Sequence, residues 1–153
     1  MKLQIKTLPL AILVLPVMAF AHPQGHADSL MSGFSHPWLG TDHLLAMLAV
    51  GMLAATQANI QKQLSLMLAF LFSLSIGVYT SIPEYLLPSA EYLVSLSVGL
   101  LGLSLLLSRK LPSWTTISII ISSGLLHGIV HGAEIPNNTQ STTFVIGMLI
   151  ASA

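Results

Sequence analysis

The chain has 153 residues, which is the usual size of a single domain. Charged residues make up 7% of it and hydrophobic residues 54%, whereas a soluble domain carries about 25% charged residues. This composition excludes a water-facing globule, and only five basic residues against five acidic ones exclude an electrostatic nucleic-acid binder. The absence of cysteine excludes disulfides, thiolate metal sites and cysteine nucleophiles. A helical membrane protein is the class that these numbers favour.

Residues 1–21 have the pattern of a secretory signal peptide. A start with two lysines precedes an apolar run, and Ala19-Phe20-Ala21 is a small-x-small cleavage site. The alternative is an uncleaved first transmembrane helix. Cleavage would leave residues 22–37 as a periplasmic N-terminal segment, in which His22 and His26 either hold a metal ion loosely or belong to an ordinary short tail.

Polar residues divide 38–153 into a predicted bundle of about five transmembrane helices. The predicted spans cover about 39–56, 64–82, 89–107, 114–132 and 142–153. A helix needs about 20 residues to cross the hydrocarbon, and the last span has only about 12, so it looks truncated. The sequence therefore predicts an all-α, polytopic transmembrane bundle.

Basic residues predict the orientation of this bundle. Lys62 lies between the first two spans and Arg109-Lys110 between the third and fourth, and loops that carry such residues stay in the cytoplasm. The acidic residues then fall on the outer side, together with the mature N-terminus. The expected location is a bacterial inner membrane with the N-terminus in the periplasm.

Ionisable residues gather at the outer ends of the first and fourth predicted spans. Such groups are costly inside a membrane and mark ion or proton paths. Imidazole suits zinc, copper, iron and nickel, and a carboxylate offsets the charge of a cation. The pattern therefore predicts a divalent-cation site. Its candidate ligands are His36, Asp42 and His43 in the first group, and His127, His131 and Glu134 in the second.

In the second group, helical spacing places all three side chains on one stripe of about 60°. Glycines at positions 124, 128 and 132 form an adjacent stripe, where another helix can approach closely. The ligand stripe is therefore predicted to face protein rather than lipid.

In the first group, Asp42 and His43 are about 100° apart, so only one of them can point straight into the site. Asp42 alone could equally be a helix-start signal. Proline disfavours helical geometry in the residue before it, so residues 36–41 are predicted to form a loop or re-entrant turn that carries His36 to the mouth. Methionines at 47, 52, 67 and 148 suggest either a soft copper path or packing, and their scatter favours packing.

The segment 36–51, which begins HPWLGTDHLLAM, resembles the signature of the HupE/UreJ family, and residues 127–134 resemble its second motif. The resemblance covers residue 22 to about 148. Family members are hydrogenase and urease accessory membrane proteins, regarded as nickel and in some cases cobalt permeases. They usually continue with a complete last helix, and the short fifth predicted span departs from that pattern. The resemblance implies that the six ligands named above are metal-handling positions, and that Glu91 matches a further family acid.

The resemblance implies an inner-membrane permease that imports Ni²⁺, or Co²⁺, for hydrogenase or urease maturation. The ion is cargo, and no prosthetic group is expected. Expected partners are the ion and the lipid bilayer, with nickel-enzyme maturation proteins and a second copy of the chain as further candidates. No enzyme activity is expected, and no phosphate loop is present. The alternatives are an intramembrane metal-dependent hydrolase, a non-transporting metal sensor or chaperone, and a haem protein with paired histidines.

Overall fold

The protein is a bundle of helices in a computed structural model that describes residues 30–80, 82–108, 110–135 and 141–153. In chain order the helices are α1 (Leu30–Leu39), α2 (Thr41–Ala55), α3 (Ile60–Val78), α4 (Leu87–Leu106), α5 (Ser113–Glu134) and α6 (Ser141–Ser152), with the short turn η2 (Glu84–Leu86) before α4. No strand occurs within these ranges, which confirms the all-α prediction for them. The predicted signal peptide, His22 and His26 lie outside the described residues.

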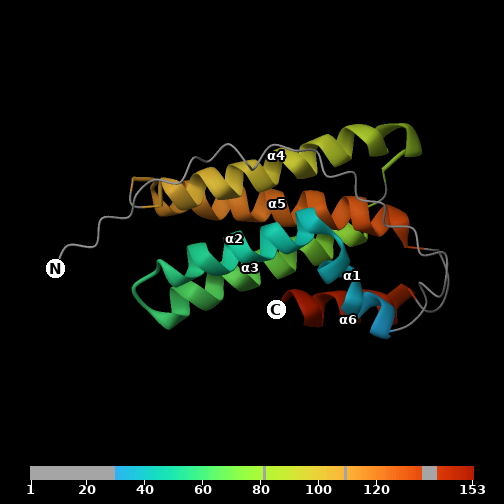
Figure 1. The fold of residues 1–153 in the computed structure, drawn as a ribbon, viewed down its shortest axis with the longest axis horizontal. Helices are drawn as coiled ribbons and strands as arrows, with labels where there is room; N and C mark the ends of the chain where they lie inside the picture. Colours follow the sequence, from blue (N-terminus) through green and yellow to red (C-terminus); the bar gives the residue numbers. More distant parts are fainter. Residues whose placement is uncertain (1–29, 81, 109, 136–140) are drawn as a thin grey trace.

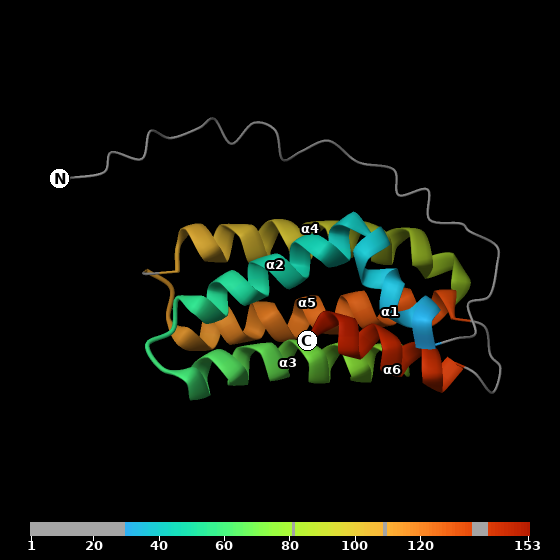
Figure 2. The same ribbon diagram turned by 60° about the horizontal axis from the view of Figure 1, so that its bottom comes forward.

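Helices α2 to α5 run along the long axis of the molecule, while the shorter α1 and α6 lie side by side near one end (Figure 1). Figure 2 shows the same pairing of α1 and α6 from another direction. Helix α3 packs chiefly on α5, α4 also packs on α5, and α2 packs on both α3 and α4. The connections from α2 to α3 and from α4 to α5 lie at the opposite end from α1 and α6.

Three of these helices, α3, α4 and α5, are long and apolar enough to cross a membrane. Helices α1 and α2 pass the same test together, but they meet at an angle of 81°, as in a broken span or a re-entrant loop. Helix α6 has 12 residues, as short as the last span was predicted to be. The described residues therefore provide three spans, or four with the bent pair, and the predicted count of five is not confirmed.

The predicted loop geometry at His36 is wrong, because His36 and Pro37 lie inside helix α1, whereas the 81° bend between α1 and α2 is compatible with the alternative of a re-entrant turn. The chain leaves helical geometry only at Gly40, whose extended backbone (φ −86°, ψ 114°) precedes α2. The local preference against a helix before proline is outweighed by packing against α6. A Cβ atom on Gly33 would collide with the carbonyl group of Phe144, so the two backbones touch at this point.

The glycine stripe of α5 lies against α3, as the predicted close approach of another helix requires. Cβ atoms added to these glycines would collide with backbone oxygen atoms of α3, one pair on each turn. The three pairs are Gly124 with Phe70, Gly128 with Leu74, and Gly132 with Val78. This contact determines the rotation of α5, and it turns the neighbouring histidine stripe toward the interior of the bundle.

Candidate metal site

Four histidines from three helices meet inside the bundle. His36 comes from α1, His43 from α2, and His127 and His131 from α5. His43 and His127 are fully buried and His131 is 6% exposed, whereas His36 is half-buried. The prediction that the stripe of α5 faces protein is therefore confirmed for both of its histidines.

Hydrogen bonds join three of the imidazoles into a chain. Nε2 of His36 lies 2.9 Å from Nδ1 of His131, and Nε2 of His131 lies 3.1 Å from Nδ1 of His43. The chain continues from Nε2 of His43 to the hydroxyl oxygen of Ser152, over 2.9 Å. Ser152 in turn donates to the carbonyl oxygen of Met148 over 2.8 Å. Helices α1, α2, α5 and α6 are thus connected through one polar network.

The fourth imidazole, of His127, is bonded differently. Its Nδ1 atom lies 2.8 Å from the carbonyl oxygen of Ser123, one turn earlier in α5. Because a carbonyl only accepts, Nδ1 carries the hydrogen, and in the neutral ring Nε2 keeps a bare lone pair. Nε2 is buried and has no hydrogen-bond partner. A buried nitrogen left unpaired costs about 1–3 kcal/mol, so this lone pair is an acceptor that the protein itself leaves unused.

The spacing of the rings suits a shared cation. Ring centres are 5.6 Å apart for His43 and His127, 5.0 Å for His43 and His131, and 6.3 Å for His127 and His131. Imidazole nitrogens bind first-row metals at about 2.0–2.1 Å, so two rings on one ion have centres within about 6.5 Å of each other. All three pairs meet this limit.

The donor atoms do not converge in the arrangement observed. Among the described residues, no group of three or more His, Asp or Glu side chains could hold a metal ion as it stands. The reason is visible in the network, since His36, His131 and His43 direct ring nitrogens at one another. A metal ion would have to replace these hydrogen bonds by rotation of the rings.

Asp42 is the second residue of α2, where a carboxylate is favoured by the helix dipole. It is half-buried, and its charge acts on His127 across the gap between α2 and α5. Its neighbour His43 is the residue that points into the bundle, as expected when two adjacent positions are about 100° apart. Gly40 leaves room for the carboxylate, because a Cβ atom there would lie 3.2 Å from Oδ1 of Asp42.

The structure describes the side chain of only one of the two predicted glutamates. Glu134 is the last residue of α5, and its side chain lies outside what the structure describes. Glu91 lies on α4 with its side chain exposed, so the structure does not bring it to the buried histidines.

Sequence reasoning missed several residues that surround the histidines. Ser123 precedes His127 by four positions, so helical spacing places it on the same face and could have identified it. Ser152 carries no such signal, because only the packing of α6 brings it to His43. Two phenylalanine rings also border the cluster. The ring centres of Phe144 and His36 are 5.4 Å apart, and those of Phe70 and His43 are 6.4 Å apart.

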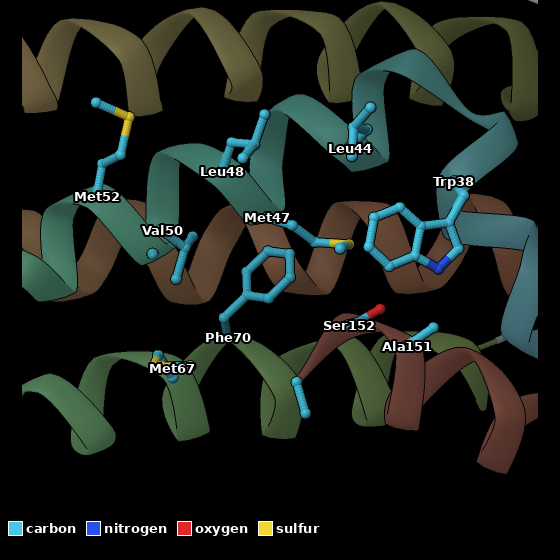
Figure 3. Close-up of a pocket in the computed structure, with 12 residues that line it drawn as sticks. Trp38, Leu44, Met47, Leu48, Val50, Met52, Met67, Phe70, Ala151 and Ser152 are labelled. Atoms are coloured by element: carbon cyan, nitrogen blue, oxygen red, sulfur yellow. The ribbon is translucent and has the colours of Figure 1, made fainter.

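An apolar cavity of about 410 Å³ opens beside this site, between α2, α3 and the end of α6. Its lining includes Trp38, Met47, Met52, Met67 and Ser152 (Figure 3). The side chains of the three methionines lie at separate places along the cavity and do not meet at one point. This arrangement favours packing over a soft-metal site.

Comparison with known proteins identifies the family. Residues 10–153 match the family model described as HupE / UreJ protein. The chain belongs to the HupE/UreJ family. It is 36% identical over 146 residues to Protein HupE of Rhizobium leguminosarum bv. viciae, a match that covers 95% of this chain and 76% of that relative. No solved structure matches the chain. The resemblance drawn from the two motifs is confirmed, and both motifs lie within the matched HupE/UreJ region.

Proposed function

We propose that this HupE/UreJ protein is an inner-membrane permease that imports Ni²⁺, or Co²⁺, for the maturation of a hydrogenase or urease. The observation that carries the proposal is the bare, buried Nε2 atom of His127, which lies beside the rings of His43 and His131. Imidazole nitrogen is a preferred ligand of nickel and cobalt, and a neutral ring with an unused lone pair can bind a cation without releasing a proton.

Charge compensation is the second requirement of such a site. A divalent ion loses hydration when it enters a low-dielectric region, and a nearby carboxylate offsets that loss. Asp42 is close enough for its charge to act on His127, and Glu134 ends the same helix that carries His127 and His131. We assign Asp42 the main electrostatic role, with Glu134 as a candidate at the mouth.

The membrane potential supplies the driving force in this proposal. Inward movement of one charge is worth about 2.3 kcal/mol per 100 mV, and therefore about 4.6 kcal/mol for a divalent ion. This free energy suffices for uptake without a nucleotide, in agreement with the lack of a phosphate-loop motif in the sequence.

The positive-inside rule supports the proposed orientation. Lys62 lies in the first turn of α3 and Lys110 between α4 and α5, at the end of the bundle opposite α1 and α6 (Figure 1). If that end is cytoplasmic, the histidine cluster faces the periplasm, where it would receive the ion.

The test is uptake of radioactive nickel by cells that lack their own nickel importer. The parent is compared with His127→Gln, which removes the ring nitrogen, and with Phe70→Leu. The phenylalanine ring is buried and has no donor atom, and its centre lies 6.2 Å from the centre of the His127 ring. We expect uptake by the parent and by Phe70→Leu, and none by His127→Gln at equal membrane expression.

Two outcomes would contradict the permease. Tight nickel binding by the purified parent without uptake would favour the sensor or chaperone. The absence of both binding and uptake would remove nickel as the cargo, and the same comparison repeated with cobalt would decide whether the site handles a divalent metal at all.

A further inference from the structure

The hydroxyl group of Ser152 lies where α6 meets the histidine cluster. Its oxygen is 2.8 Å from the carbonyl oxygen of Met148, one turn earlier, and 2.9 Å from Nε2 of His43. A serine hydroxyl has one hydrogen, and a carbonyl can only accept, so that hydrogen is used on Met148. Toward His43 the same oxygen can only accept, and Nε2 of His43 must therefore be the donor.

This assignment determines the tautomer of the buried ring. A neutral imidazole carries one hydrogen, so a protonated Nε2 leaves Nδ1 of His43 with a bare lone pair. Nδ1 then accepts from Nε2 of His131 over 3.1 Å, and when the ring of His131 is neutral its Nδ1 accepts from Nε2 of His36 over 2.9 Å. The direction of the entire imidazole chain thus follows from one serine.

We propose that Ser152 is a positioning residue for metal uptake, which holds His43 as the Nε2–H tautomer, so that Nδ1 keeps the lone pair that binds the arriving divalent cation once the hydrogen bond from His131 is displaced. This inference rests on the proposed permease function. The carbonyl oxygen of Ser123 has the equivalent effect on His127, since it accepts from Nδ1 and leaves Nε2 bare. In metalloproteins, the second ring nitrogen of a ligating histidine almost always donates to such a partner.

The hydroxyl of Ser152 is not needed to attach α6 to the bundle. Buried Phe144 and Met148 pack against Leu74 of α3, and Gly147 lies against the backbone of α1 at Leu30. Substitution of Ser152 by alanine therefore removes the acceptor of His43 and leaves these apolar contacts in place. The loss should appear in metal binding and in the tautomer of His43 rather than in folding.

The experiment compares the purified parent with Ser152→Ala, Ser152→Thr and the control Ser75→Ala. Ser75 is matched to Ser152, because it is half-buried and donates over 2.8 Å to the carbonyl oxygen four residues earlier, with no imidazole on its hydroxyl. We expect nickel affinity to fall about 10- to 100-fold in Ser152→Ala, the range seen when such a partner is removed. Ser152→Thr, which keeps the hydroxyl, and Ser75→Ala should bind like the parent.

The ring-nitrogen ¹⁵N chemical shifts of His43, measured without metal, provide the second readout. They separate protonated from bare nitrogen, and we expect a protonated Nε2 in the parent and in Ser152→Thr, and a mixture of tautomers in Ser152→Ala. A bare Nε2 in the parent, or parental nickel affinity in Ser152→Ala, would overturn the role of Ser152 while leaving the permease intact. If the parent neither binds nor transports nickel, the permease proposal fails, whereas the tautomer measurement still decides whether Ser152 orients His43.

Discussion

Nε2 of His36 lies 2.9 Å from Nδ1 of His131, although 95 positions separate the two residues in the sequence. The rings meet edge to face, with centres 4.6 Å apart and planes at 88°. Since α1 packs mainly on α6, this contact joins the α1–α6 pair to the long helices of the bundle. It also explains why a residue just before the bend at Gly40 belongs to the same site as residues near the end of α5.

Replacement of His36 by alanine should abolish nickel uptake while membrane insertion stays normal. The substitution removes the imidazole at the outer end of the hydrogen-bonded series, so we expect uptake to fall at least about tenfold. Because the His36 side chain is only half-buried, little packing should be lost. Uptake is measured at equal membrane expression. The neighbouring Ser35→Ala is the control, because its hydroxyl bonds only within α1, to the carbonyl oxygen of Ser32. Parental uptake by His36→Ala would remove this residue from the site.

Asp42 and Glu91 should differ sharply in their effect on uptake. Asp42→Asn removes the charge that acts on His127, so we expect uptake to fall about tenfold or more. Its effect on stability should stay below about 1 kcal/mol, the usual size of a helix-dipole contribution. Glu91→Gln changes an exposed acid away from the cluster and should transport like the parent. Equal losses of uptake in both variants would show that uptake depends on the total negative charge of the outer side and not on Asp42 in particular.

Gly128→Ala should destabilise the bundle. A Cβ atom there would meet the backbone of α3 at Leu74, which no rotamer change can relieve, and overpacking of this kind costs about 1–3 kcal/mol. Thermal unfolding in detergent is the measurement. Gly99→Ala in α4 is the control, since nothing lies within 4 Å of its added Cβ, and it should unfold at or above the parental temperature. A parental midpoint for Gly128→Ala would mean that α3 and α5 are not in backbone contact.

The absence of cysteine makes the orientation directly testable. Single cysteines are introduced at Gln61, which is exposed in the first turn of α3, and at Tyr85, which is 79% exposed in η2. We expect a membrane-impermeant maleimide to label Tyr85→Cys on intact cells, and Gln61→Cys only after the membrane is opened. The reverse pattern would place the histidine cluster on the cytoplasmic side and contradict its role as the site that receives the ion from the periplasm.

Much of the helix content could be predicted from the sequence, because apolar runs and polar breaks are local features. The predicted spans 64–82, 89–107 and 114–132 correspond to α3, α4 and α5 with shifts of a few residues at their ends. The same reasoning was wrong at His36, where a local rule about proline was outweighed by the contact between Gly33 and Phe144.

The sequence by itself determined which residues a membrane chain of this kind must shield, since ionisable groups are too costly to leave in lipid. It therefore identified His36, His43, His127 and His131 before any fold was known. Only the tertiary structure decided which ring nitrogen faces which partner, that Ser152 and Ser123 lie within hydrogen-bond distance of the rings, and that the side chain of Glu91 is exposed. The physical reason is that these relations depend on the rotation and crossing of helices. In this bundle they are determined by glycines that let one backbone touch another, and the backbones that they touch lie far away in sequence.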